Sequence, residues 1–317
     1  MTLTIERCDD SELWTRVGAE ANADQPEYAA GRVIWPPYAR PHNDGADLSV
    51  VASVGGQPVA RLQRRGETVL DVSVIPEHRR RGVGTALMEF ALRDARERGV
   101  RSVWPHLYVD EDDRPALALF DHFGFERRAV YSMVADLTEP VPHETLERAR
   151  GLREQGFRAR LLDPHSPADL ALAGEIQARY FPGAPGYVSE AEFVRAHLQG
   201  GGMGMLLEKS SRWAGFILGV VHCATRNGRF VRRPEWGLLA SIATSDEFRR
   251  IGVASTIMCE FIDLLKRQSR PPVRYLLYGG VGPEGDPSRG VAQSVGARRE
   301  VRHVAFRKEL SPTDPTS

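Results

Sequence analysis

The clearest pattern in the chain is a change of hydrophobic period between residues 70 and 99. Apolar and polar side chains alternate over 70–74, which is typical of a β-strand with one buried face. From Gly84 to Ala95 the apolar positions recur at helical spacing, and Gly99 is a suitable helix stop. The pattern therefore predicts a strand that turns into a helix through a short loop rich in arginine and glycine.

The rest of the first half is also predicted to consist of both strands and helices. Residues 102–109 read as a second strand, broken or bulged near Pro105. Residues 114–123 predict a short helix with Pro115 in its first turn, ending at Gly124. A further strand is predicted over 129–137.

The second half repeats the core of this order. It predicts a strand over 238–244, a helix over 254–268, a strand over 274–279 and a late strand over 301–310. Residues 278–290, which contain several glycines, predict a mobile loop.

Two nearly identical loops indicate two related domains in tandem. Arg79 and Arg249 take matching places 170 positions apart, about half the chain, whereas solenoid repeats would recur every 20–50 residues. Pro140, Pro142 and a charged helical stretch mark the connector. We expect a first domain over 1–139, a linker helix over 140–156, a second domain over 157–311 and a disordered tail over 312–317.

The composition excludes several classes of protein. In 317 residues, 42 basic and 42 acidic side chains cancel, so no net charge draws the chain to nucleic acid or anionic membranes. Three cysteines without a CxxC spacing predict neither a disulfide framework nor a zinc site, and Cys259 is expected to be a buried thiol. We expect no bound metal, no signal peptide or membrane span, and a cytoplasmic location.

The loop between strand and helix suits a phosphate. Glycines let the backbone approach a ligand closely, and the free amides and dipole of the helix's first turn attract an anion. A dinucleotide fingerprint needs a small third residue where Leu87 stands, and the chain has no Gly-Lys-Ser/Thr of a P-loop. The loop therefore predicts a cradle for another cofactor that carries phosphate.

The motif V-x-P-x-x-R-x-x-G-x-G, from Val74 to Gly84, resembles the coenzyme A signature of the GCN5-related N-acetyltransferase (GNAT) superfamily. The stretch from Leu107 to Phe125 is similar to the next motif of that family, and the second half matches the first motif only. The resemblance implies an α/β (α+β) fold: two tandem GNAT-like domains, each with a mixed, mostly antiparallel central sheet flanked by helices and with splayed fourth and fifth strands. The two-domain plan is similar to that of mycothiol synthase.

The resemblance also implies which residues hold the cofactor, acetyl-CoA. Amides at the start of the helix would bind the pyrophosphate, and the strands that end in Val74 and Val109 would admit the pantetheine arm. The expected residues of the first half are Val74, Arg79, Arg80, Arg81, Gly82, Val83, Gly84, Thr85, Asp113 and Phe120. Those of the second half are Thr244, Arg249, Arg250, Ile251, Gly252, Val253, Ala254 and Ser255.

Acetyl transfer to an amine requires a base for the amine and a proton for the departing thiolate. Asp71, three residues before Val74, is the first candidate, with an arginine-paired carboxylate as the alternative; His106 and Tyr108 follow on the next strand. Many family members carry a tyrosine as the acid in the second motif. Phe120 and, in the second half, Ala292 stand at that place, so neither half has the usual acid.

Two functions are compatible with the sequence. The first is an acetyl-CoA-dependent N-acetyltransferase that acts on a small-molecule amine by direct attack in a ternary complex, with the first half as the better equipped site. The second is a coenzyme A-binding sensor or scaffold in which one or both halves are silent. We expect a monomer or a homodimer without nucleic-acid or membrane partners.

Overall fold

The computed structural model describes residues 2–24, 47–105, 109–111, 113–181, 190–199, 202–226, 229–281 and 286–310. The first half consists of β1 (Leu3–Arg7), α1 (Ser11–Ala21), β2 (Leu48–Val54), β3 (Gln57–Arg65), β4 (Thr68–Val74), η1 (Pro76–His78), α3 (Val83–Glu97), β5 (Ser102–Pro105), β6 (Val109–Asp110), α4 (Arg114–His122) and β7 (Glu126–Asp136).

The second half begins with an additional helix. Its elements are α5 (His143–Glu154), β8 (Arg158–Leu161), α6 (Pro167–Tyr180), α7 (Glu190–Gln199), β9 (Gly202–Lys209), β10 (Arg212–Arg226), β11 (Arg229–Thr244), η2 (Asp246–Phe248), α8 (Val253–Gln268), β12 (Tyr275–Val281), α9 (Pro287–Ser294) and β13 (Arg299–Glu309).

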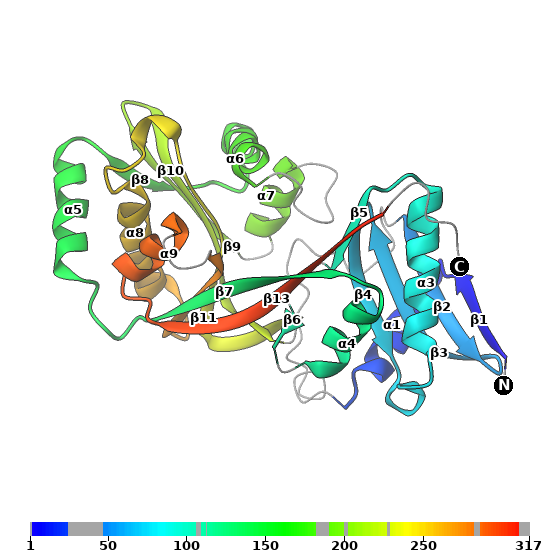
Figure 1. Cartoon of the computed structure of the whole chain (residues 1–317). Helices are drawn as coiled ribbons and strands as arrows, with labels where there is room; N and C mark the ends of the chain where they lie inside the picture. Colours follow the sequence, from blue (N-terminus) through cyan, green and yellow to red (C-terminus); the bar gives the residue numbers. More distant parts are fainter. Residues whose placement is uncertain are drawn as a thin grey trace.

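One sheet runs through both halves, in the order β1-β2-β3-β4-β5-β13-β7-β12-β11-β10-β9-β8. The last strand of the chain, β13, lies between β5 and β7 of the first half, while β7 pairs on its other side with β12 of the second half. Figure 1 shows β7 and β13 as a long two-stranded ribbon that crosses from one half to the other. Each half thus completes its sheet with a strand from the other half.

The packing of side chains confirms that the ribbon is shared. Val304 and Phe306 of β13 are buried in the first-half core together with Leu87 and Phe120. Met133 of β7 is buried in a core of the second half. Because burial of an apolar side chain contributes about 1.5–3 kcal/mol, neither half has its full core without the other half's strand.

Most elements lie where the hydrophobic pattern places them. The mixed and mostly antiparallel sheet, flanked by helices, confirms the expected fold class. The register agrees with a bulge near Pro105, because seven residues separate Val103 from Asp110, whereas five separate their partners Lys308 and His303 in β13. Cys259 is 2% exposed, and burial raises the pKa of its thiol to about 11.

The prediction of a mobile loop over 278–290 is wrong at both ends of this range. Residues up to Val281 continue β12, and α9 begins at Pro287. The start of this helix has a sequence signal, because Asp286 accepts a hydrogen bond from the amide of Ser288 and a proline follows this cap directly. The many glycines before Asp286 conceal that signal.

None of the helices in the described ranges is long and apolar enough to cross a membrane. No group of three or more His, Cys, Asp or Glu side chains in the same ranges is arranged to hold a metal ion.

Candidate cofactor site

The first glycine loop has the backbone that an anion site requires. β4 ends at Val74, η1 follows, and Gly82 takes a left-handed conformation (φ 80°) directly before α3. No side chain caps α3 among the residues described, and the first four amides of a helix have no partner within the helix. The amides of Val83, Gly84 and Thr85 therefore carry the positive end of the helix dipole at this loop.

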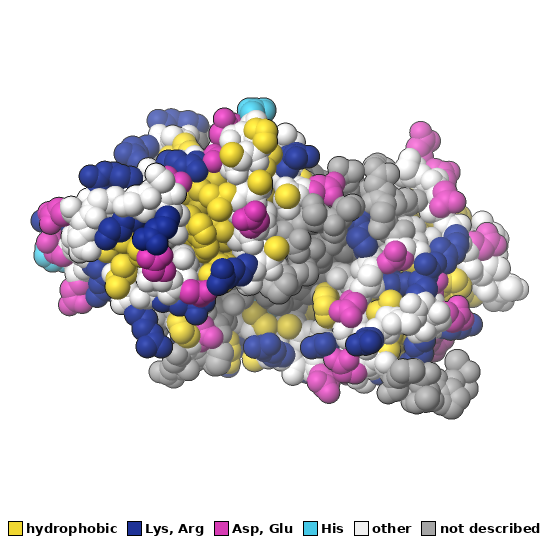
Figure 2. All heavy atoms as spheres, turned by 90° about the horizontal axis from the view of Figure 1, so that it is seen from above, with side chains coloured by type: hydrophobic (Ala, Val, Ile, Leu, Met, Phe, Trp, Pro, Cys, Tyr) yellow, Lys and Arg dark blue, Asp and Glu magenta, His cyan; other side chains and the backbone are white. Residues whose placement is uncertain are grey.

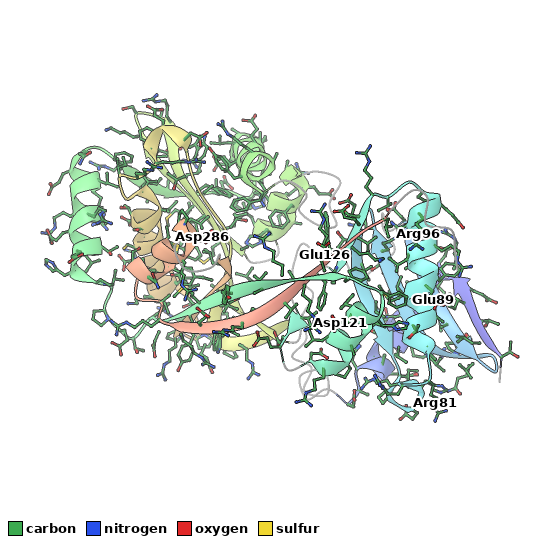
Figure 3. All side chains as sticks on the ribbon, viewed as in Figure 1. Arg81, Glu89, Arg96, Asp121, Glu126 and Asp286 are labelled. Carbon is green, nitrogen blue, oxygen red and sulfur yellow. The ribbon has the colours of Figure 1, made fainter. Side chains whose placement is uncertain are left out.

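Gly82 on the loop is exposed. A methyl group at Gly82 would meet no atom of the described residues within 4 Å, and at Gly84 it would lie 3.6 Å from the Val74 side chain. Arg80 and Arg81 on the same loop are exposed. Figure 3 shows Arg81 next to the first turn of α3, whereas Arg96 lies at the other end of this helix. The loop is thus accessible and carries two exposed arginines.

Arg79 fixes the loop in place. Its guanidinium donates to the carbonyl of Val74 (Nε–O, 3.0 Å) and to the carbonyl of Ala21 at the end of α1 (Nη2–O, 2.7 Å). It also bonds to Asp24, and this hydrogen bond holds the pKa of the Asp24 carboxyl below its usual value. Because all of these bonds are within the protein, Arg79 holds the end of β4 and the loop in place.

The second loop repeats the first in its backbone. Arg250 has φ 66° where Arg80 has 61°, and Gly252 has φ 96° where Gly82 has 80°. Arg249 bonds to Asp246 (Nη2–Oδ1, 2.7 Å), and its guanidinium lies 6.0 Å from the ring centre of Tyr180 at the end of α6. The similar sequences therefore produce a matching turn from strand to helix.

The surroundings of the second loop differ. A methyl group at Gly252 would overlap Cδ of Arg148, from the connector helix α5, and would lie 2.8 Å from its Cγ. Ser255, in the first turn of α8, is buried and bonds to Ser294 of α9 (Oγ–Oγ, 2.8 Å). The Thr145 hydroxyl of α5 donates to the Ser294 carbonyl (2.6 Å). The helix α5 thus lies over the start of α8, a covering that the sequence pattern did not reveal.

The other predicted contacts of the second half lie around this loop. Thr244 is the last residue of β11, and Ala254 follows Val253 in the first turn of α8. Val253 is buried in the core, whereas Ile251 on the loop is 44% exposed.

Within the described residues, β4 and β5 run parallel and pair at Thr68–Trp104 and Val69–Pro105, whereas Val109 pairs with Val304 of β13. Residues 106–108 lie outside the described ranges, so the splaying of these strands stays a prediction. A slot for an extended ligand arm would open where such pairing ends, next to the end of β4 at Val74.

Two predicted cofactor residues of α4 make contacts within the protein. The carboxylate of Asp113 caps α4 by accepting from the amide of Ala116 (3.2 Å). Phe120 is 7% exposed and packs against Phe306 of β13, with ring centres 4.8 Å apart. Phe120 therefore belongs to the core, and its partner from the far end of the chain is a residue that the motifs did not identify.

The three predicted catalytic side chains cannot be placed. His106 and Tyr108 lie outside the described residues. Asp71 belongs to β4 by its backbone, but its side chain is outside the described set. Their roles stay predictions.

Comparison with known proteins agrees with this geometry. Residues 6–125 match the model of the acetyltransferase (GNAT) family. The chain is 34% identical over 148 residues to a mycothiol acetyltransferase of Thermomonospora curvata, covering 44% of this chain and 48% of that protein. It is 31% identical over 145 residues to a mycothiol acetyltransferase of Thermobifida fusca, covering 37% of this chain and 41% of that one. The match thus spans less than half the length of these relatives.

The fold has a full-length counterpart among solved structures. A tandem GNAT protein from the clavulanic acid biosynthesis pathway covers 99% of this chain and 100% of its own, with a TM-score of 0.62 and 17% identity. Identity this low supports the fold alone. The chain therefore has the fold of this tandem GNAT protein, a segment over residues 6–125 that matches the GNAT family model, and a partial similarity to the mycothiol acetyltransferases.

Proposed function

We propose that the chain is an acetyl-CoA-dependent N-acetyltransferase that transfers an acetyl group to a primary amine of a small molecule by direct attack in a ternary complex. The observation that carries this proposal is the exposed loop at Gly82, which lies within the segment that matches the GNAT family. The named relatives are mycothiol acetyltransferases, which supports the acetyl group as the one transferred.

The residues present fit the cofactor. The amides of Gly82 through Thr85 would bind its pyrophosphate, with Arg80 and Arg81 adding charge at the rim. The pantetheine arm would pass between Val74 and Val109, since β6 pairs with β13 and no pairing of β6 with β4 is found among the described residues. Bound there, acetyl-CoA supplies an activated acetyl thioester; the protein positions it and handles the amine's proton.

Binding of the cofactor by the residues of the second loop stays a prediction. Arg148 covers Gly252, and Ser255 is buried, so we propose that the first half is the working cofactor site. We keep the division into domains at 1–139 and 157–311, with the linker helix over 140–156 and the tail over 312–317, as part of the proposal. The shared strands β7 and β13 then cross this division.

The proposed setting is the cytoplasm, as a monomer or a homodimer, without nucleic acid or membrane as partner. Equal numbers of acidic and basic residues support the lack of nucleic-acid and anionic-membrane partners. On the face seen in Figure 2 the two signs are interspersed and form no single basic area.

A second candidate function rests on Phe120. A phenyl ring in the core cannot give a proton to a thiolate, so the chain could bind coenzyme A as a sensor or scaffold without catalysis. Release of free thiol from acetyl-CoA in the presence of glucosamine, spermidine or glycinamide separates the two functions. Release that depends on the amine supports the enzyme, whereas binding of acetyl-CoA without release with any amine supports the sensor.

A further inference from the structure

A buried histidine and an aspartate meet beside the proposed thioester position. His303 of β13 and Asp110 of β6 are bonded through Nδ1 and Oδ1 at 2.8 Å. Their side chains are 6% and 21% exposed. The motifs did not identify either residue, and 193 positions separate them along the chain.

The strand register places this pair beyond the last pairing of β4 with β5. β13 pairs with β5 at Lys308–Val103 and, five residues further along β13, with β6 at His303–Asp110. Five strand residues span about 17 Å. β4 also runs five residues, from its last pair with β5 at Val69 to its end at Val74. Because Val69 pairs with Pro105, two residues beyond Val103, the pair lies about two residues (~7 Å) short of the end of β4, beside the part of β4 that the pantetheine arm would pass.

The pair faces the side of the sheet opposite to α3 and α4. Val109 and Val304, the neighbours of the pair in sequence, are buried in the same core as α3 and Phe120. Successive side chains of a strand point to opposite faces. Asp110 and His303 are thus on the other face of the sheet, on which a second substrate would meet a thioester held between the strands.

We infer that His303 is the general base of the first-half site and that Asp110 positions its ring; this rests on the proposed function. A carboxylate that accepts from Nδ1–H fixes the tautomer in which Nε2 carries the lone pair. Proton transfer by a positioned histidine accelerates a reaction by about 10²–10⁴-fold. The base thus comes from β13, far in the sequence from the first-half motifs, and takes the place of the candidates Asp71 and His106.

The proton balance also accounts for the missing tyrosine. The amine nitrogen forms a bond to the acetyl carbon, and His303 Nε2 takes the proton that the nitrogen loses. The carbon–sulfur bond then breaks, and the imidazolium returns that proton to the departing thiolate, directly or through water. One residue serves as base and acid, and the products are the amide and free coenzyme A thiol.

The first test needs no acceptor. In the NMR spectrum of the full chain labelled in its histidine rings, the His303 signals are identified by their loss in His303→Gln. Saturating acetyl-CoA is expected to shift these signals and leave those of the exposed His143 and His165 unchanged. If calorimetry shows that acetyl-CoA binds and the His303 signals do not move, the inference is overturned and the proposed function stands. If acetyl-CoA does not bind, the proposed function fails and takes the inference with it.

The second test separates chemistry from binding. With whichever of glucosamine, spermidine and glycinamide the wild type acetylates fastest, His303→Gln is expected to lower kcat about 10²–10⁴-fold and to leave KM for acetyl-CoA unchanged. Asp110→Asn is expected to lower kcat with the same unchanged KM, while Asp110→Glu restores part of it. His143→Gln, the same change at an exposed position, is the control. Full kcat in His303→Gln contradicts the inference.

Discussion

The two glycine loops of this chain have the same backbone and different surroundings. Arg80 and Gly82 in one loop, and Arg250 and Gly252 in the other, share the same unusual left-handed torsion angles. Gly82 is exposed, whereas the Arg148 side chain lies against Gly252. The difference arises from α5, a helix that precedes the second half and has no counterpart before β1 in the part of the first half that the structure describes.

The comparison teaches that a motif specifies a turn and does not specify access to it. The local sequence dictates the glycine conformation and the free amides, because both depend on neighbouring residues only. Whether a cofactor reaches those amides depends on what packs above them. Here a helix about a hundred residues earlier in the sequence decides it.

The largest expected effect is that of Gly82→Glu. The change places a carboxylate over the anion site, and repulsion between unit charges 4 Å apart is about 4 kcal/mol at an effective dielectric constant of 20. We expect acetyl-CoA affinity to fall roughly 100-fold or more, measured by calorimetry. Gly56→Glu is the matched control, because Gly56 also has a positive φ (83°) and open space around it. Equal affinity in the two variants would remove the first loop from the site.

Phe306→Ala tests whether the first loop depends on the strand from the far end of the chain. Phe306 is 4% exposed, and its loss is expected to cost about 3–5 kcal/mol in the free energy of unfolding. Because its ring packs on Phe120, acetyl-CoA affinity is expected to fall as well.

Phe157→Ala provides the matched comparison for Phe306→Ala. Phe157 is fully buried in the second-half core, so a similar loss in the free energy of unfolding is expected, measured with urea. The affinity of the first loop for acetyl-CoA is expected to be retained. Loss of affinity in Phe157→Ala alone would contradict the assignment of the site to the first half.

Acid is expected to weaken the second half through His197. Burial lowers the pKa of this histidine to about 4, against 6.5 ordinarily. A lowered histidine pKa means that the unfolded chain takes up the proton first, so stability is full above pH 6.5 and falls as the pH drops toward 4. The loss approaches roughly 3 kcal/mol at pH 4, at 1.36 kcal/mol per pKa unit.

Unfolding by urea at several pH values checks this expectation. His197→Gln removes the part of the pH dependence that comes from this group, although the variant is less stable at pH 7. His165→Gln, at an exposed position, keeps the wild-type profile. An unchanged slope between pH 6.5 and 4 in His197→Gln would show that other groups carry the acid response.

Arg148→Ala has the smallest expected effect and bears most directly on the second loop. The side chain is exposed, so stability is expected to change by no more than about 0.5 kcal/mol. Its removal uncovers Gly252, and we expect a second, weaker acetyl-CoA site in the titration. Arg150→Ala, two residues further along the same helix with its side chain 65% exposed, is the control. If Arg148→Ala still shows a single site, Arg148 is not what covers the loop.

The sequence predicted the features that depend on nearby residues. The period change before Gly82 placed β4 and α3, and Pro115 marked the start of α4. The insertion of β13 between β5 and β7 had no such signal, because strand partners separated by some 200 residues leave no local pattern. For the same reason the motifs identified neither Arg148 above Gly252 nor His303 beside Asp110.

The measurement that tests the account most directly is a calorimetric titration of the wild-type chain with acetyl-CoA, read for stoichiometry. The account predicts one saturable site per chain, which is lost in Gly82→Glu. Two equivalent sites in the wild type, or one site that survives Gly82→Glu, would contradict the assignment of the cofactor to the first loop.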